Sequence, residues 1–579
     1  MQFASWNQTG KEPSLRNLEG IPEFFIGKPF TQRQLGLILA LLMLLTVIPR
    51  LLLARQISVI CDDGYFYLSV VEMWKQGQTD AALNYLNLNI FPFILWGLES
   101  AGLAFPWHFK IWGILISGLT VLPLFGLVRR LFNDRWATIA VLLFAMHPEL
   151  VKLSVEPIRE STYWFCFILA SYLLLRCATS RDNIATPIAA GLATACAILT
   201  RTEGWTLIPL ACFWLFSLAP ATVSRLRQTQ RIVIVLAMIP LCMFAMNLTL
   251  LAEYPHWQWG RFDRVPKIVA WMQSQVSPTN NPQAKTMAAA TQSRPRLSHS
   301  TTETDNSSSN LKSIEKRADE KAIWFEFLNK FSESYEYFNL VLLIVGLTQC
   351  HRLLRSRTYA PLLMIAAAIL LAVLVLLVQH RNINGRYFLS VFIITLPIQA
   401  AGAACLIQII QSVALPKTIS HHQKLVVTAT FVLSVSLIFW FEALTSRHES
   451  RVAQANLGKY LRTTFGPFEK VETDRKSGRV GFHTVGKMPN ILYNTIQKKY
   501  THPDLLILVR PVRAAHRARA HRSGLREIPL HDLPQSEFTA FVHPSRIHQN
   551  SASKAQPHID GENGNQPDPS ITGRSEVLR

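Results

Sequence analysis

The stretch Cys61-Asp62-Asp63-Gly64-Tyr65-Phe66-Tyr67 comes just after the first long apolar segment of the chain, Leu35–Leu53. Two adjacent carboxylates therefore lie where a membrane-spanning helix would leave the bilayer. A carboxylate at the edge of a membrane is costly to desolvate, so its presence there needs a functional or structural reason. Asp62 and Asp63 are for this reason the first candidates for a functional site.

The composition predicts a membrane protein. The chain has 579 residues, of which 49% are hydrophobic and 16% are charged, whereas a soluble domain has about 25% charged residues. The net charge of +21 indicates basic loops beside anionic lipid, and no nucleic-acid-binding module is recognisable, so we expect no nucleic acid partner. The eight cysteines form no CxxC pair, which argues against a disulfide framework and a thiolate metal site.

Eleven apolar segments are candidate membrane spans, and three of them (the third, sixth and eighth) are shorter than the roughly 20 residues that a crossing needs. The segments are Leu35–Leu53, Ile111–Leu131, Trp136–His147, Ser161–Cys177, Ile184–Thr200, Gly204–Leu218, Ile232–Leu251, Tyr337–Gln349, Tyr359–Gln379, Tyr387–Ile410 and Leu425–Leu444.

Loop charge predicts the orientation. Residues 1–34 lack the pattern of a cleaved signal peptide, so we expect this segment to be cytoplasmic and the first apolar run to remain as an anchor. Nearly every loop on that side is then basic, as the positive-inside rule requires, while the opposite loops carry the carboxylates. An odd number of spans places the C-terminus outside.

The outer segments differ in character. Residues 54–110 form a first outer loop, in which Asn89–Trp96 is too apolar for a free loop and too short to span, and so predicts a helix in the interface plane. Residues 277–321 are polar and predicted to be disordered. Residues 446–545 are predicted to form a small extracytoplasmic α/β domain with strands at Val480–Val485, Leu505–Val509, Arg526–Leu530 and Phe538–Val542, and residues 546–579 a disordered tail.

The predicted topology places several charged side chains at one membrane face: Asp62, Asp63, Arg159, Glu160, Arg201, Glu203 and Arg386, the last followed by Tyr387. Arginine suits a phosphate because its planar fork binds two oxygens and stays charged, and a carboxylate can accept a proton from a nucleophile. Each element also has a structural interpretation: a solvated turn or helix cap for the aspartates, an ion pair for Arg159 with Glu160, helix-end capping with side chains that reach the lipid headgroups for Arg201 and Glu203, and an interfacial anchor for Arg386-Tyr387. It is only the location of all these residues on one membrane face that favours a functional site over the separate structural interpretations.

The stretch Asp62-Asp63-Gly64-Tyr65-Phe66-Tyr67-Leu68, followed by Trp74-Lys75-Gln76-Gly77, resembles the first outer loop of the GT-C superfamily of membrane glycosyltransferases. It is most similar to the family 39-like group of protein mannosyltransferases and aminoarabinose transferases. Leu199-Thr200-Arg201-Thr202-Glu203-Gly204 and Arg386-Tyr387 resemble later blocks of that family. The likeness covers residues 35–445, a GT-C-like catalytic domain, although the insert at 277–321 is not expected of the family.

The resemblance implies an inverting transfer of a sugar from a polyprenyl-phosphate donor to an acceptor on the extracytoplasmic side. It implies Asp62 as the general base, with Asp63 in support, and Arg201 and Arg386 at the donor phosphate. Tyr65, Arg159, Glu160, Glu203 and Tyr387 are further substrate-binding candidates. We predict no metal and no cofactor. We expect the acceptor to be a lipid, a glycan or a protein. We expect the chain to lie in the inner membrane of a bacterial cell envelope.

Two other interpretations remain open. A transporter or lipid-carrier flippase would place charges near the bilayer midplane and often contains internal repeats, whereas here the charges lie at one face and no repeat is visible. A membrane scaffold that displays the C-terminal domain would tolerate replacement of Asp62.

Overall fold

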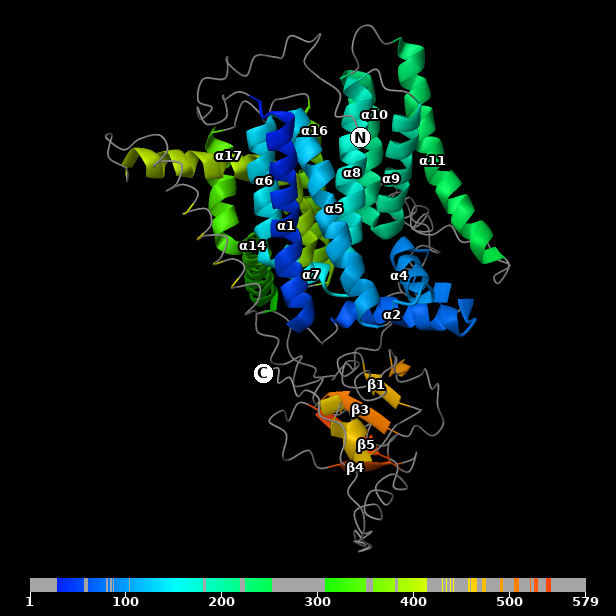
Figure 1. Cartoon of the computed structure of the whole chain (residues 1–579). Coiled ribbons are helices and arrows are strands. Elements are labelled where there is room, and N and C mark those ends of the chain that lie inside the picture. The colour runs from blue at the N-terminus through cyan, green and yellow to red at the C-terminus, as the bar shows by residue number, and fades with distance from the viewer. Residues whose placement is uncertain are drawn as a thin grey trace, which may run out of the picture. The chain divides into compact units, whose positions relative to one another are not determined.

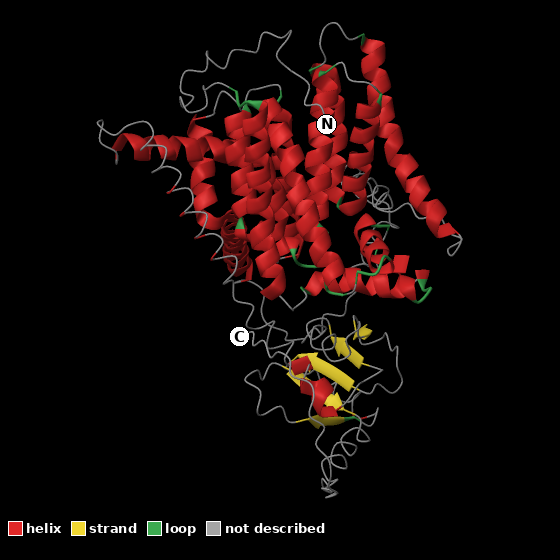
Figure 2. Cartoon of the chain, in the orientation of Figure 1, coloured by secondary structure: helices red, strands yellow, loops and turns green. Residues whose placement is uncertain are grey.

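Apolar helices make up the first of two structural units in the computed structural model, Met1–His448, and strands mark the second, Glu449–Arg579. Figure 2 shows this division between helix and strand. The structure describes residues 29–56, 61–79, 82–83, 86, 88–103, 105–180, 184–218, 224–251, 308–349, 358–380, 384–413, 430, 434, 438, 441, 457–458, 460–465, 471–474, 490–492, 505–509, 521, 525–528 and 538–542. We treat the two units separately.

The helices of the first unit run mostly side by side, as a bundle (Figure 1). In chain order they are α1 (Gln32–Gln56), α2 (Asp62–Lys75), α4 (Ile90–Ser100), α5 (Trp107–Leu131), α6 (Asp134–Met146), α7 (Pro148–Ser154), α8 (Glu160–Thr179), α9 (Ala185–Thr200), η3 (Thr202–Thr206), α10 (Leu207–Ser217), α11 (Arg225–Leu251), α14 (Ser308–Gln349), α16 (Ala360–His380), η5 (Gly385–Phe388) and α17 (Leu389–Val413).

Six of the described helices are long and apolar enough to cross a membrane, or seven if the bent pair α6–α7 counts as one span. The chain is therefore an integral membrane protein. Helices also occupy the shorter predicted segments, such as α9 and α10, but each of these has too few residues to span alone. The last predicted span, Leu425–Leu444, lies almost wholly outside the described residues, so the count of eleven stays a prediction.

Two glycines bring α14 and α17 into close contact. A Cβ atom on Gly402 would lie 1.9 Å from the carbonyl oxygen of Leu342, and one on Gly346 would lie 2.0 Å from that of Ile398. Small residues at such a crossing let helix backbones approach, which is how membrane helices gain packing energy without a hydrophobic driving force.

The bend between α6 and α7 measures 62° and is built from local chemistry. Pro148 begins α7, where its missing N–H is no loss. The His147 Nδ1 atom accepts from the Leu150 amide at 3.4 Å and so caps α7. From α1, the buried Arg50 side chain donates to the carbonyl of Ala145 at 3.2 Å, which satisfies an acceptor at the end of α6.

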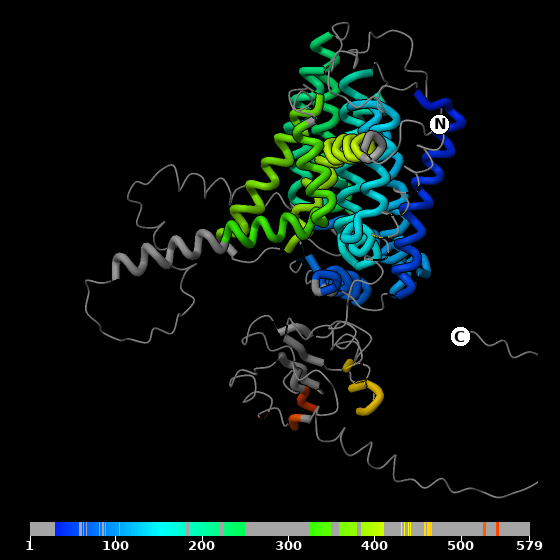
Figure 3. Tube along the Cα trace, turned by 90° about the vertical axis from the view of Figure 1, so that its left-hand side faces the viewer, coloured from blue at the N-terminus to red at the C-terminus, as the bar shows by residue number. Residues whose placement is uncertain are grey.

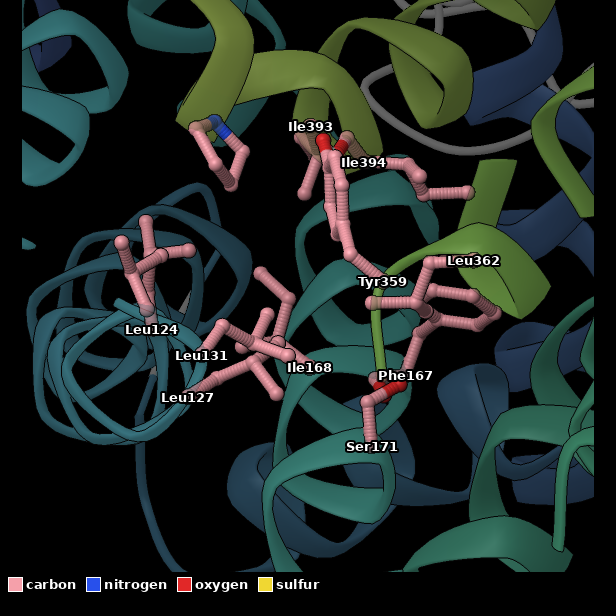
Figure 4. Close-up of a pocket in the computed structure, with 12 residues that line it drawn as sticks. Leu124, Leu127, Leu131, Phe167, Ile168, Ser171, Tyr359, Leu362, Ile393 and Ile394 are labelled. Atoms are coloured by element: carbon pink, nitrogen blue, oxygen red, sulfur yellow. The ribbon is translucent and has the colours of Figure 1, made fainter. Parts of the chain in front are cut away.

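A small cavity lies among α5, α8, α16 and α17 (Figure 4). Its volume is about 20 Å³, which is room for about one water molecule. It is lined mainly by apolar side chains: Leu124, Leu127, Val128, Leu131, Phe167, Ile168, Ser171, Tyr359, Leu362, Ile393, Ile394 and Pro397. None of the site residues predicted from the sequence lines this cavity, so we do not assign it a catalytic role.

The short elements α2, α4 and α7 lie at one end of the bundle, which we call the site end (Figure 1). Helix α4 occupies the segment predicted as an interfacial helix, and the Asn89 side chain caps it by accepting from the Phe91 amide at 2.9 Å. It packs on α2 through edge contacts of Trp74 with Phe93 and Trp96. The helix itself is confirmed, and its position in the membrane interface stays a prediction.

The prediction of disorder for 277–321 is wrong for its last part, because α14 begins at Ser308. That part is rich in helix formers, and Glu315 and Asp319 lie within a turn of lysine and arginine residues. Residues 277–307 lie outside the described residues. Helix α14 is broken at Glu336, whose φ of 51° is non-helical. The part before the break runs across the bundle, and the part after it runs along the bundle (Figure 3).

The second unit contains a five-stranded sheet of order β2-β1-β3-β5-β4. Its strands are β1 (Val471–Asp474), β2 (Asn490–Leu492), β3 (Leu505–Val509), β4 (Arg526–Ile528) and β5 (Phe538–Val542). β1 pairs in parallel with β2 and β3, while β5 pairs antiparallel with β3 and β4. Three strands thus occur where the sequence predicts them. The predicted strand Val480–Val485 and the tail 546–579 lie outside the described residues, and an α/β domain at 446–545 stays a prediction.

Candidate functional site

Five charged side chains from distant parts of the sequence meet at the site end of the bundle. Asp63 comes from the first turn of α2, Glu160 begins α8, Arg201 follows α9, Glu203 lies in η3 and Arg386 lies in η5. All five were predicted from the sequence as residues of one membrane face. The structure goes further and joins them in one continuous chain of ion pairs.

Arg201 is the centre of this charged cluster. Its Nη1 atom lies 2.7 Å from Glu160 Oε1, and its Nη2 atom lies 2.6 Å from Glu203 Oε1. The side chains of Arg201 and Glu160 are each only 3% exposed. The rings of Tyr163 and Tyr387 lie 5.7 and 5.3 Å from its guanidinium carbon. Arg201 is thus enclosed by two carboxylates and two aromatic rings.

A tight turn between α9 and η3 creates this arrangement. Arg201 leaves the helix in an extended conformation, with φ −143° and ψ 147°. Gly204 then packs directly on α9, because a Cβ atom there would lie 2.6 Å from the Ala197 carbonyl carbon. The turn thereby directs Glu203 back toward Arg201, and Arg201 Nε lies 3.2 Å from both carboxylate oxygens of Glu203.

Arg386 is the second cation of the cluster and the more accessible one. Its guanidinium forms an ion pair with Asp63 and lies 3.7 Å from Glu160 Oε1. The side chains of Arg386 and Asp63 are 17% and 26% exposed. Glu160 therefore contacts two arginines at once, one fully enclosed and one partly exposed.

Three polar atoms, two in the cluster and one in the neighbouring Arg159, have no hydrogen-bond partner within the described residues. They are Glu160 Oε2, Arg386 Nε and Arg159 Nε. Buried polar atoms are normally paired, so these three mark where a substrate group could bind. The guanidinium of Arg159 lies 5.9 Å from the ring of Tyr67. Burial is the main cause that raises the pKa of Tyr67 to about 12.

The remaining predicted residues are only partly placed. Asp62 and Tyr65 belong to the first turns of α2, but their side chains lie outside the described residues. Tyr387 contacts the cluster through its ring, which lies 5.7 Å from the Arg386 guanidinium carbon. No group of three or more His, Cys, Asp or Glu side chains suited to a metal ion occurs in the described part of the chain. The absence of a metal therefore stays a prediction.

Sequence reasoning missed Tyr67 and Tyr163 as aromatic walls of the site. Both are buried, and both fall within apolar stretches where an aromatic residue is ordinarily a core residue. A signal was present for Tyr163, which follows Glu160 by three positions and so lies on the same face of α8.

Burial alone would raise the pKa of Glu203, but the adjacent Arg201 guanidinium lowers it to about 2, against an ordinary value of 4.5. A carboxylate with a depressed pKa stabilises the folded state above its unfolded pKa, and this stabilisation is lost as the pH falls toward the folded value. The measurement is the difference between the melting temperatures of wild type and Glu203→Gln. We expect this difference to be constant from pH 8 to about 5 and to shrink below about pH 4.5. A difference that already shrinks near pH 7 would contradict this assignment.

Comparison with known proteins shows which family and which fold the chain resembles. Residues 91–249 match the model of the family described as dolichyl-phosphate-mannose-protein mannosyltransferase. The oligosaccharyltransferase of Archaeoglobus fulgidus in the apo form is similar in structure, with 12% identity over 85% of this chain and 72% of that chain and a TM-score of 0.50. The predicted GT-C resemblance is confirmed, and the fold of the helical unit is GT-C-like.

Two further solved structures are similar to the chain. ArnT from Cupriavidus metallidurans in the apo state is 13% identical over 87% of this chain and 97% of that chain, with a TM-score of 0.48. The same protein bound to undecaprenyl phosphate is 13% identical over 88% and 98%, with a TM-score of 0.47. No curated protein sequence matches the chain.

Proposed function

We propose that the chain is an inverting glycosyltransferase that moves a sugar from a polyprenyl-phosphate donor to an acceptor on the extracytoplasmic side of the membrane. The observation that carries the proposal is the charged cluster of Asp63, Glu160, Arg201, Glu203 and Arg386 at one end of a GT-C-like helix bundle. The family that residues 91–249 match is described by a dolichyl-phosphate sugar donor, which supports a donor of this class.

The charges at the two ends of the bundle support an extracytoplasmic position for the site. The end opposite the site carries Arg129, Arg130 and Arg176 in the last turns of α5 and α8, which the positive-inside rule assigns to the cytoplasm. The site end would then face the outside of a bacterial inner membrane, with the N-terminus cytoplasmic and the C-terminal segment extracytoplasmic.

The two arginines of the cluster have different roles in this proposal. Arg201 is buried and fully occupied by Glu160 and Glu203, so it holds the site together. Arg386 is half-buried and has an unpaired Nε atom. A donor phosphate could therefore displace Asp63 from Arg386 and bind the planar guanidinium through two oxygens.

The reaction is one displacement. The acceptor hydroxyl attacks the anomeric carbon from the face opposite the phosphate, a new carbon–oxygen bond forms, and the bond between the carbon and the phosphate oxygen breaks. Asp62 takes the hydroxyl proton, and polyprenyl phosphate leaves already charged, so it needs no acid. Inversion at the anomeric carbon follows from this geometry. Arg386 and Arg159 would stabilise the charge that develops on the leaving phosphate.

Arg386→Gln should lower kcat/KM for the donor by about 10- to 100-fold, because a charge-assisted hydrogen bond contributes about 1.5–3 kcal/mol. Arg386→Lys keeps the charge without the two-point fork and should recover only part of the loss. The measurement uses membranes that contain the chain, a panel of radiolabelled polyprenyl-phosphate sugars, and label counted in the acceptor fraction.

The same assay separates the transferase from its main alternative. A flippase or transporter would carry the labelled donor across the bilayer with its sugar–phosphate bond intact, and no label would enter an acceptor. If the folded chain transfers no sugar from any donor of a broad panel, the result contradicts the proposed function.

A further inference from the structure

Arg386 lies on a single turn of 3-10 helix, η5, which packs against α14, α16 and α17. The Asn384 side chain accepts from the Arg386 amide at 3.2 Å and begins the turn. A guanidinium that must meet a phosphate within a few tenths of an ångström needs a backbone held from outside. The part of α14 before its break supplies such support.

Ser334 provides the polar contact between α14 and η5. Its Oγ atom lies 2.8 Å from the carbonyl oxygen of Gly385 and 2.5 Å from that of Lys330 in its own helix, so one hydroxyl proton is shared between two acceptors. The approach is close, because a Cβ atom on Gly385 would lie 2.6 Å from Ser334 Oγ. Gly385 directly precedes Arg386, so this contact fixes the peptide that carries the arginine.

Ser334 is in turn held from the bend between α6 and α7. His147 Nε2 lies 3.1 Å from the Ser334 carbonyl oxygen. The His147 Nδ1 atom accepts a hydrogen bond from the Leu150 amide, so the proton of the neutral ring is on Nε2, which donates to Ser334. The break at Glu336 leaves this carbonyl accessible to a donor from another element.

Aromatic packing supports the same contact. The rings of Phe327 and Phe331 lie 5.3 and 5.5 Å from that of Phe388, the last residue of η5, and the ring of Tyr335 lies 5.4 Å from that of Phe392. These α14 residues recur at i, i+4 and i+8, so they form one face of the helix. That face and Ser334 together pack against η5 and the first turn of α17.

We propose that Ser334 is a positioning residue for Arg386: its hydroxyl fixes the Gly385 peptide and thereby the direction of the Arg386 guanidinium, while His147 holds the backbone of Ser334 through its carbonyl oxygen. The inference rests on the proposed function, because it gives Arg386 the donor phosphate. It adds a second layer to the site, built from α14 and from the bend between α6 and α7.

The test compares Ser334→Ala, which removes the hydroxyl, with Ser334→Thr, which keeps it, in the full chain. Ser332→Ala is the matched control, because among the described residues the Ser332 hydroxyl bonds only to the Asn329 carbonyl oxygen of its own helix. Hydrogen exchange of the Arg386 and Tyr387 amides should become several-fold faster in Ser334→Ala and remain at the wild-type rate in Ser334→Thr and Ser332→Ala. Equal exchange in all four proteins, or equal acceleration in Ser334→Ala and Ser334→Thr, overturns the inference.

Kinetics give the second measurement. A lost neutral hydrogen bond corresponds to about 0.5–1.5 kcal/mol, so Ser334→Ala should raise the donor KM by about 2- to 10-fold, leave the acceptor KM unchanged, and regain wild-type values in Ser334→Thr. A purely structural defect would instead reduce the amount of folded enzyme and lower kcat alone. Since hydrogen exchange needs no sugar transfer, it decides the positioning role even if the wild-type chain transfers no sugar, an outcome that would contradict only the proposed function.

Discussion

Asp62→Asn should lower the rate of sugar transfer by about 10²–10⁴-fold, the usual contribution of a general base. The amide has the shape of the carboxylate and cannot take the proton of the acceptor hydroxyl. Asp62 is the first residue of α2, after the N-cap Cys61, so loss of its charge near the helix N-terminus should lower the free energy of unfolding by no more than about 1 kcal/mol. The measurement is the initial rate of label transfer at saturating donor, together with the melting temperature of the purified variant.

Asp63→Asn is the informative neighbour. Asp63 is paired with Arg386 and partly exposed, so its loss should mainly change donor binding and reduce transfer less than Asp62→Asn does. If Asp63→Asn is inactive while Asp62→Asn retains its rate, the class of enzyme stands and Asp63 is the base. Full activity of both variants would remove both aspartates from the chemistry.

Arg201→Met should be the most destabilising single change at the site. It leaves the buried Glu160 with only the more distant Arg386, and it leaves the half-buried Glu203 without the cation that pairs it. Breaking a buried pair by removing one partner costs about 3–5 kcal/mol, because a charge remains without compensation. We expect a correspondingly large fall in the free energy of unfolding in detergent, and loss of transfer through loss of folded protein.

Arg225→Met is the matched control, because Arg225 is exposed at the start of α11; its stability should stay within about 0.5 kcal/mol of wild type. Adding Glu203→Gln to Arg201→Met should recover part of the loss, since the side chain at position 203, which has lost its cation, is then neutral. If Arg201→Met is as stable as Arg225→Met, the ion pairs of Arg201 contribute nothing to the fold.

Much of the helical unit is predictable from the sequence, because the bilayer requires long apolar segments and the apolar runs of this chain are clear. The end at which the charged residues gather also follows from loop charge alone. The ends of a helix are harder to predict, as the start of α14 at Ser308 shows. Composition indicated disorder there, while the local spacing of acidic and basic residues favoured a helix.

The pairing within the site could not be derived from the sequence. Glu160 and Arg201 are 41 positions apart, and Asp63 and Arg386 are 323 apart, and no local pattern states which carboxylate meets which arginine. The sequence suggested an ion pair of Arg159 with Glu160, and helix-end caps for Arg201 and Glu203. The structure instead pairs Arg201 with both Glu203 and Glu160, and Glu160 links Arg201 to Arg386. Ser334 had no signal at all, because its partner Gly385 is 51 positions away.

The central claim is that the sugar–phosphate bond of a polyprenyl-phosphate donor is broken and that the sugar passes to an acceptor. The most direct test reconstitutes the purified chain in liposomes with a labelled donor, and measures polyprenyl phosphate, glycosylated acceptor and the anomeric configuration of the product. We predict equal amounts of the two products, an inverted anomeric centre, and loss of both products in Asp62→Asn. Intact donor that has only crossed the bilayer would contradict the account and identify a lipid-carrier flippase.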